Sequence, residues 1–263
     1  MTTPVYAEAS SRSSRGWLAA LGDAIADLLF PPHCVVCNQY GAWLCSECQA
    51  QIDAVRPPIC QRCGYPLSPA NLSPAGTSNC PHCPKAAPHL AGLRSFGLHD
   101  GPLRKAIHQF KYQHVQTLAV PLGEMMGLGW QVLCPPGLEI DVIVPVPLHT
   151  NRQRQRGFNQ AAVLARQLGF QLDIPVFDNT LRRTRATAPQ VDLSLAEREK
   201  NVHGAFQATG RTLSGQCLML VDDVCTTGST LEAAAYALRE GGVQTVWAYT
   251  LARAKGNLRP SRG

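Results

Sequence analysis

The sequence has no uninterrupted apolar run of about 18 residues, the length that a membrane-spanning helix requires. Its most apolar N-terminal stretch, residues 17–30, is shorter and contains Asp23 and Asp27. That stretch also lacks the cleavage pattern of a signal peptide. We therefore expect a cytoplasmic protein without a membrane span.

Aromatic residues and net charge are also low. Phe, Trp and Tyr make up 6% of the chain, so a platform for stacking bases is not evident. The formal net charge is +6, from 24 Lys and Arg against 18 Asp and Glu. This mild excess is compatible with a polyphosphate ligand and with a nucleic acid, and it favours neither.

Cysteine, in contrast, is abundant and clustered. Eight of the 11 cysteines lie between residues 31 and 84 as four Cys-x-x-Cys pairs. The two-residue gap lets two thiolates of one tight turn reach the same metal, and four thiolates complete a tetrahedral zinc site. Two structural Zn²⁺ sites are predicted, and sequence order assigns Cys34, Cys37, Cys45 and Cys48 to one and Cys60, Cys63, Cys80 and Cys83 to the other. An interleaved pairing fits the same spacing.

Two other interpretations of the cysteines are a disulfide framework and an iron–sulfur cluster. Disulfides require an oxidising compartment, and no export signal is present. Two four-cysteine sites of this spacing favour zinc over iron–sulfur. Because closed sites leave no open coordination position, we expect this segment to be structural, or a platform for a partner or a nucleic acid. Its few core aliphatics indicate that metal binding supplies most of its folding free energy.

The most informative stretch is residues 217–242. Residues 217–221 form an apolar run typical of a strand buried on both faces, and a loop is predicted from Asp222 and Asp223 to the Thr-Thr-Gly-Ser-Thr segment 226–230. A helix is predicted over 231–240. Backbone N–H groups at such a strand-to-helix turn favour a phosphate, and the carboxylates can accept hydrogen bonds from a diol or favour a metal ion. The pattern predicts a sugar-phosphate site; the alternative is an ordinary polar turn that caps a helix. It is not a Walker A loop, because no Gly-Lys-Ser/Thr follows the glycine.

A second apolar strand is predicted over residues 140–146. It is followed by three arginines, which we predict to lie in a loop, and by a helix over about 158–168 that ends at Gly169. Ligands of open α/β sheets bind beyond the carboxyl ends of the strands, so this loop and the 226–230 loop are expected at one edge. The arginines, which alone would suggest a solvated cluster, then favour anion binding: Arg152, Arg154 and Arg156.

The remaining pattern defines the expected domains. Strands are predicted over 93–99 and 245–252, and helices over 102–112, with Lys105 and Lys111 on the outer side, and over 116–133. Residues 181–206 are predicted to form a lid, or else a surface segment. The expected organisation is a disordered tail (1–16), a packing helix (17–30), a zinc-ribbon domain (31–90), an α/β domain (91–254) and a basic tail (255–263).

Several separated segments resemble the ComF family, also called GntX-like. They are the paired Cys-x-x-Cys motifs, Phe-Lys-Tyr at 110–112, Val-Pro-Val-Pro-Leu at 144–148, Arg-Gly-Phe-Asn-Gln at 156–160, the series Gln190, Arg198, Asn201 and Ala205-Phe206, and the loop at 226–230. Residues 221–230 resemble the signature with which type I phosphoribosyltransferases bind phosphoribosyl pyrophosphate (PRPP). The resemblance covers nearly the whole chain after the tail.

The resemblance implies a double zinc ribbon followed by a type I phosphoribosyltransferase-like domain, with a parallel sheet flanked by helices. It implies PRPP binding with Mg²⁺, and a role in DNA uptake during natural transformation, with competence proteins as partners, or in nucleotide metabolism. Asp222 and Asp223 would hold the ribose hydroxyls, and residues 146–150 with Arg156 would lie near the pyrophosphate. The 5-phosphate would be wrapped by Thr226, Thr227, Gly228, Ser229 and Thr230.

One departure concerns the pyrophosphate end. Many metabolic relatives place glycines or a basic residue directly after the strand, whereas this sequence has Pro-Leu-His-Thr at 147–150. Binding is therefore better supported than turnover, and no residue is identified as a general acid or base. The alternatives to a phosphoribosyltransferase are a non-catalytic PRPP- or nucleotide-sensing competence factor that contacts single-stranded DNA, and a structural zinc adaptor with a relic fold.

Overall fold

The computed structural model describes residues 31–68, 80, 83, 87–112, 115–185, 204–209 and 213–255. The packing helix predicted for residues 17–30, the tail 1–16 and nearly all of the tail 255–263 lie outside these ranges. So do most residues of the predicted lid, including Gln190, Arg198 and Asn201. No helix within the described ranges is long and apolar enough to cross a membrane.

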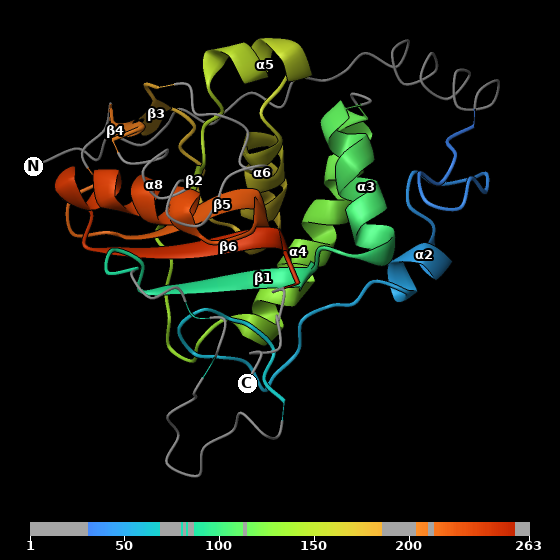
Figure 1. The fold of residues 1–263 in the computed structure, drawn as a ribbon, viewed down its shortest axis with the longest axis horizontal. Helices are drawn as coiled ribbons and strands as arrows, with labels where there is room; N and C mark the ends of the chain where they lie inside the picture. Colours follow the sequence, from blue (N-terminus) through green and yellow to red (C-terminus); the bar gives the residue numbers. More distant parts are fainter. Residues whose placement is uncertain are drawn as a thin grey trace, which may run out of the picture.

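A four-stranded parallel sheet forms the centre of the molecule (Figure 1). Its order is β1 (Gly92–Leu98), β6 (Thr245–Arg253), β5 (Cys217–Cys225) and β2 (Val142–Pro145), and all three pairings are parallel. Residues 218–221 of β5 are completely buried, as a strand covered on both faces requires. The predicted α/β class with a parallel sheet is confirmed.

Strand β5 continues beyond residue 221, to Cys225. The prediction that a loop begins at Asp222 is therefore wrong. Asp222 pairs with Thr250 and Cys225 with Arg253, because β6 runs alongside β5 to its end. Backbone hydrogen bonds to a long neighbouring strand extend β5 even where its side chains are polar. The local sequence of β5 does not reveal that β6 is this neighbour. Both acids therefore lie within the strand.

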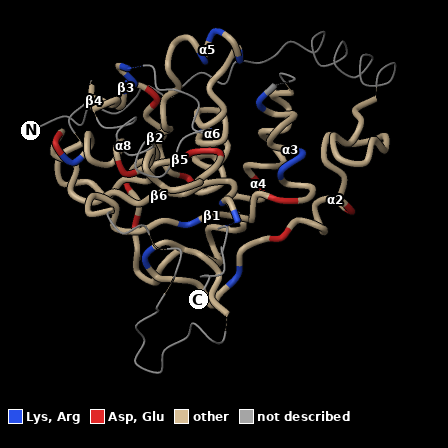
Figure 2. Tube along the Cα trace, in the orientation of Figure 1, with Lys and Arg blue, Asp and Glu red and all other residues tan. Residues whose placement is uncertain are grey.

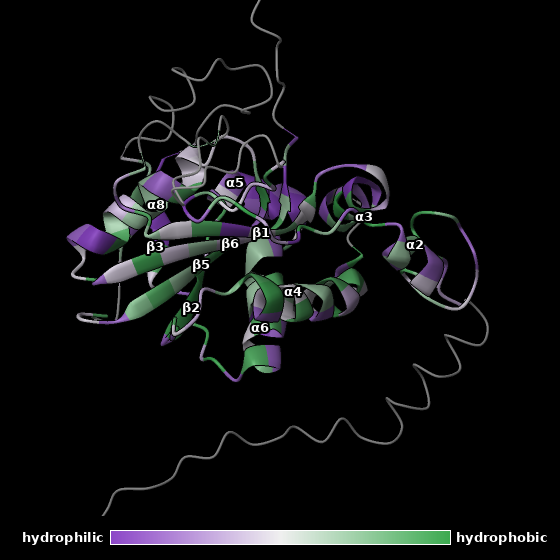
Figure 3. Ribbon diagram, turned by 90° about the horizontal axis from the view of Figure 1, so that it is seen from below, coloured by the Kyte–Doolittle hydropathy of each residue, from purple (hydrophilic) through white to green (hydrophobic). Residues whose placement is uncertain are grey.

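Helices cover both faces of the sheet (Figure 3). α4 (Ala119–Leu133) and α6 (Gln160–Leu172) cover one face, and α8 (Ser229–Glu240) covers the other. Each face has its own apolar cluster: Met219 and Val221 pack with α4 and α6, whereas Leu218 and Leu220 pack with α8. This alternation follows from the two-residue period of a strand. α3 (Gly101–Tyr112) joins the cluster of α4 and α6, and α4 is preceded by the 3₁₀ turn η2 (Gln116–Leu118).

The segment after β2 differs from the prediction. Its arginines lie not in a loop but on a short helix, α5 (Thr150–Arg156), which begins where the His149 ring accepts a hydrogen bond from the Asn151 N–H. It ends at Gly157 with φ 74°. The helix has no apolar stripe, so hydrophobic periodicity could not reveal it.

The end of helix α6 also differs from the prediction. Gly169 was predicted to terminate it, but the helix continues to Leu172 and Asp173 follows with φ 56°. A Cβ on Gly169 would lie 2.4 Å from the Val176 side chain. Gly169 thus permits close packing against Val176. Because a glycine near the end of a helix usually terminates it, the sequence alone did not indicate this packing role.

Two smaller units flank the sheet. β3 (Leu181–Arg183) and β4 (Phe206–Ala208) form an antiparallel pair at the two ends of the predicted lid. On the opposite side of the sheet, the segment after α2 (Ser46–Ala50) runs antiparallel to the edge strand β1. There the Val55 N–H donates to the Phe96 carbonyl at 2.8 Å, and the Leu98 N–H donates to the Asp53 carbonyl at 2.9 Å. The cysteine-rich region thereby covers an edge that would otherwise be unpaired.

Candidate functional site

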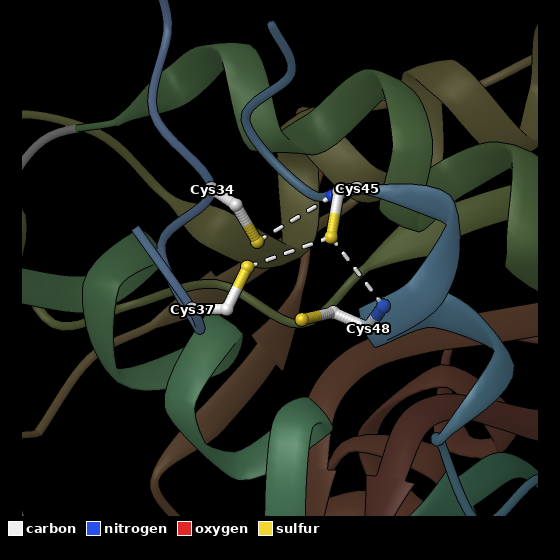
Figure 4. A group of neighbouring side chains, drawn as sticks. All are labelled: Cys34, Cys37, Cys45 and Cys48. Carbon is white, nitrogen blue, oxygen red and sulfur yellow. Dashed lines mark hydrogen bonds between the residues drawn. The ribbon is translucent and has the colours of Figure 1, made fainter. Parts of the chain in front are cut away.

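The structure groups the first four cysteines around one point (Figure 4). The sulfur atoms of Cys34, Cys37, Cys45 and Cys48 all lie within 4.8 Å of one another. Cys45 is the N-cap of α2, and its backbone N–H donates to the Cys34 sulfur at 3.5 Å. Burial opposes ionisation of Cys34, but backbone hydrogen bonds led by that of Cys45 lower its pKa to about 6. These contacts favour the thiolate that a metal needs.

The second cluster has the same form: Cys60, Cys63, Cys80 and Cys83. The sulfurs of Cys60 and Cys83 are 3.4 Å apart, and those of Cys63 and Cys80 are 3.6 Å apart. Four sulfurs bound to one Zn²⁺ at about 2.3 Å lie roughly 3.8 Å from one another, whereas a disulfide bond is only about 2 Å long. Both clusters, each assembled in sequence order, therefore fit two structural zinc sites.

The two acids of β5 lie at the carboxyl end of the sheet. Asp223 is directed to the side of α3. Asp222 lies near enough to Lys111 and to Arg183 of β3 for both cations to act on its charge. The Asp223 Oδ2 lies 2.9 Å from the Nζ of Lys111, the penultimate residue of α3. The expectation that Lys111 points outward is therefore wrong: its side chain is 18% exposed and that of Asp223 12%.

The electrostatics of Asp222 set it apart from an ordinary surface carboxylate. Burial among neighbouring side chains, followed by the charge of Asp223, raises the pKa of Asp222 to about 7, although part of the residue remains accessible. The Asp223 N–H donates to Asp222 Oδ1 at 2.8 Å, and this bond, Lys111 and Arg183 act in the opposite direction. A pKa of about 7 means that the protonated and ionised forms of Asp222 are both populated near neutral pH.

The candidate phosphate loop, residues 226–230, connects these acids to α8. Gly228 is the N-cap of α8, with φ 86°, and as a glycine it has no side chain with which to cap the helix. The left-handed φ favours glycine. The hydroxyls of Thr227 and Ser229 lie 2.8 Å apart, and the Ser229 N–H donates to Thr227 Oγ1 at 3.3 Å. The start of α8 thus places two hydroxyls beside the positive end of the helix dipole, an arrangement suited to an anion.

Arg156 lies at the same edge of the sheet, as the last residue of α5. Its guanidinium donates to Gln160 Oε1 at 3.2 Å, and Asn159 Nδ2 donates to the Val146 carbonyl at 3.1 Å. The residues 156–160 thus tie α5 and α6 to the end of β2. An open hollow of about 460 Å³ next to α5 is lined by Thr150, Gln153, Arg154 and Gly157, and by none of the residues 222–230.

Sequence reasoning missed two cations of this site. Lys111 was predicted to lie on the outer side of its helix and was otherwise part of the Phe-Lys-Tyr segment, and Arg183 was one of the basic residues that begin the predicted lid. Arg183 is buried on β3, with its guanidinium 5.2 Å from the centre of the Phe206 ring. Burial and then Arg152 lower its pKa, while Asp222 raises it. Figure 2 shows basic residues on α3, α5 and β3 around the acidic end of β5.

The fold and this arrangement define a protein with a zinc-ribbon region and a phosphoribosyltransferase domain. Residues 25–84 match the double zinc ribbon domain family, and residues 139–263 match the phosphoribosyl transferase domain family. The chain is 34% identical to competence protein F of Haemophilus influenzae, over 80% of this chain and 90% of that protein. It is 33% identical to DNA utilization protein YhgH of Salmonella typhimurium, over 86% of this chain and 99% of that protein. The chain belongs to the ComF family.

Two solved structures also resemble part of the chain. A glutamine PRPP amidotransferase from B. subtilis is 23% identical with a TM-score of 0.35, and the match covers 52% of this chain and 26% of that one. An adenine phosphoribosyltransferase from Leishmania tarentolae is 11% identical with a TM-score of 0.34, over 56% and 75% of the two chains.

Proposed function

We propose that the chain binds PRPP together with Mg²⁺ at the carboxyl end of its sheet. The observation that carries the proposal is the succession along β5 and α8 of two acids, a glycine turn and a helix start beside two hydroxyls. Asp222 and Asp223 would face the ribose diol and the metal ion. Residues 226–230 would hold the 5-phosphate through hydroxyls and backbone N–H groups.

We also infer that each cysteine cluster holds one structural Zn²⁺. Support comes from the four-sulfur donor sets, their spacing and the match to the double zinc ribbon family. With four thiolates on each ion, no coordination position is left for a substrate. The zinc ions would therefore support the fold instead of taking part in a reaction.

The cellular role that we propose is in DNA uptake or nucleotide metabolism. It is suggested by relatives named competence protein F and DNA utilization protein YhgH. If PRPP is turned over, a nitrogen nucleophile displaces pyrophosphate from its C1 atom. The chain's contribution would then be to hold the diol, the phosphate and the metal in place.

A second candidate is a PRPP- or nucleotide-sensing competence factor that contacts single-stranded DNA without turnover. It is favoured by residues 147–150, which contain neither Lys nor Arg, and by the arginines of α5, which could contact a phosphate backbone. Pyrophosphate release measured with a panel of nucleobases separates the two candidates. Release of pyrophosphate with any of the bases supports the enzyme. Tight binding of PRPP without pyrophosphate release with any base supports the sensor.

Calorimetric titration of the zinc-loaded protein tests the binding proposal. We expect PRPP to bind with Mg²⁺ present and to bind at least about tenfold more weakly without it, a difference of about 1.4 kcal/mol. The physical reason is that a divalent cation offsets repulsion between the acids and a polyanion. Pyrophosphate with Mg²⁺ is the control, because it lacks the ribose. Absence of PRPP binding, or equal affinity for pyrophosphate, would contradict the proposal.

PRPP affinity is expected to increase as the pH rises through about 7. A ribose hydroxyl donates to the ionised form of Asp222, whereas the protonated form predominates below the raised pKa. Below that value, affinity should fall by up to about tenfold per pH unit, because binding must then release one proton. Asp223, Lys111 and Arg183, the charged groups that act on Asp222, set where the change occurs.

Titrations at pH 6, 7 and 8 measure this effect. The ligand's own phosphates also titrate near pH 6, so Asp222→Asn serves as the control that retains only the ligand's contribution. If wild type and Asp222→Asn show the same pH dependence, ionised Asp222 is not a ligand for PRPP.

A further inference from the structure

Lys111 enters the candidate site from outside the phosphoribosyltransferase match. That match begins at residue 139, whereas Lys111 lies on α3, which precedes β2 in the chain. Its ammonium is nevertheless 2.9 Å from Asp223 Oδ2. Both side chains are mostly buried, so the contact is not a solvated surface ion pair, which would contribute little.

Packing fixes the position of Lys111. The preceding residue, Phe110, is completely buried, and its ring meets that of Phe158 edge-on with the centroids 5.4 Å apart. Leu103, Ala106 and Ile107 bury the same face of α3 in the apolar cluster. Phe110 thus packs against Phe158, and this contact holds the end of α3 where Lys111 reaches the end of β5.

The charges at this edge explain why a cation is needed there. Two adjacent carboxylates repel the phosphates of a polyanionic ligand, and the segment that follows the neighbouring strand β2 supplies no Lys or Arg at 147–150. Lys111 and Arg183 are the two cations that stabilise the ionised form of Asp222, and they come from different elements. His99 does not supply a positive charge in place of Lys111. Its pKa is lowered, mainly by burial and next by the charge of Lys111, and the lowered pKa favours the neutral imidazole.

We propose that Lys111 is a positioning and charge-compensating residue of the ligand site. Its ammonium holds the Asp223 carboxylate in place and offsets its charge, so that a polyanionic sugar phosphate can bind against the paired acids. The inference rests on the proposed PRPP site and adds to it a residue from a segment that precedes the phosphoribosyltransferase match. It also provides a cation that residues 147–150 lack.

The test compares Lys111→Gln with Lys105→Gln in titrations with PRPP and with ribose 5-phosphate, both with Mg²⁺. Gln keeps a hydrogen-bond donor for Asp223 but removes the charge, and Lys105 is an exposed lysine of the same helix. We expect Lys111→Gln to weaken PRPP binding by about tenfold or more, and ribose 5-phosphate binding less, because the attraction scales with ligand charge. Lys105→Gln should change both affinities by less than about twofold.

The pH profile gives a readout that a merely structural role would not move. Without Lys111, Asp222 loses a cation that lowers its pKa, so the increase in PRPP affinity should shift to higher pH in Lys111→Gln. Unchanged PRPP affinity in Lys111→Gln, or equal weakening of both ligands with an unshifted profile, would overturn the inference. If the wild type binds neither ligand, the proposed function itself fails, and the two failures are thereby distinguished.

A second pair of variants applies if Lys111→Gln does not fold. The ratio of the PRPP and ribose 5-phosphate affinities is then compared between Asp223→Asn and Lys111→Gln/Asp223→Asn. The double variant removes both charges of the pair, so it leaves no unpaired buried charge from it. Removal of Lys111 should still lower PRPP affinity more than ribose 5-phosphate affinity, because Asp222 remains and Lys111 also offsets its charge. Equal ratios in the two variants would overturn the inference.

Discussion

Replacing Cys60 with serine is expected to destabilise the parallel sheet as well as the zinc ribbon. The turn between Cys60 and Cys63 presents its carbonyl groups to two buried arginines of the sheet. Arg94 on β1 donates to the Gln61 carbonyl at 2.9 Å, and Arg253 on β6 donates to the Cys63 carbonyl at 2.7 Å. These arginines are only 1% and 3% exposed.

The backbone adds to this coupling. The Leu93 N–H of β1 donates to the Arg62 carbonyl at 2.9 Å. Gly64, with φ 67°, lies so close to β1 that a Cβ would be 2.4 Å from the Leu93 carbonyl oxygen. Because the turn lies directly against the edge strand, loss of the zinc that orders it would expose that strand.

The expected loss is several kcal/mol. A hydrogen bond to a charged group contributes about 1.5–3 kcal/mol, and two buried guanidinium groups would each lose an acceptor. A ligand substitution also removes much of the metal-binding free energy that folds the ribbon. Hydrogen exchange of the β1 and β6 amides should therefore accelerate markedly in Cys60→Ser, and removal of zinc with a chelator should reproduce the change.

Cys37→Ser is the matched control for this experiment. It removes a ligand of the first cluster by the same chemical change, but the turn that it disrupts makes no hydrogen bond to Arg94 or Arg253 among the described contacts. Exchange should accelerate around α2 and much less in β6. If Cys60→Ser leaves β1 and β6 protected, or if Cys37→Ser accelerates exchange in β6 as much as Cys60→Ser does, the arginines do not couple the second cluster to the sheet.

The double substitution Asp222→Asn/Asp223→Asn is expected to lower PRPP affinity by about 100-fold or more. Each carboxylate would accept a charge-assisted hydrogen bond from a ribose hydroxyl, and such a bond contributes about 1.5–3 kcal/mol. Two such bonds correspond to at least about two decades of affinity. Calorimetric titration with PRPP and Mg²⁺ measures the loss, and circular dichroism establishes that the variant is folded.

Asp141→Asn provides the comparison at the other end of the same strand. Asp141 Oδ2 accepts a hydrogen bond from the Cys217 N–H at 2.7 Å, so this residue also contacts β5. Its distance along the strand from Asp222 means that PRPP affinity should change by less than about twofold. Wild-type affinity in the folded double variant would reject Asp222 and Asp223 as the PRPP site. A structural zinc adaptor with a relic fold predicts instead that the double variant keeps its cellular function, so loss of that function would rule the adaptor out.

The pattern of the sequence determined the types of the main elements. The apolar run at 217–221 predicted a buried strand, and the apolar spacing at 102–112 and 231–240 predicted two helices; the structure has β5, α3 and α8 there. These predictions succeeded because the periods of a strand and of a helix are local properties. The Cys-x-x-Cys spacing likewise predicted the two clusters, since the ligands of each pair come from one turn.

Only the tertiary structure decided which residues face one another across the chain. Helix α5 has no apolar stripe, and the extension of β5 depends on pairing with β6. Lys111 meets Asp223 across the chain where α3 packs into the core, with Phe110 on Phe158, and the zinc-ribbon turn is coupled to the sheet by Arg94 and Arg253. Such contacts join residues far apart in sequence, and no local period encodes a partner that folding alone brings close.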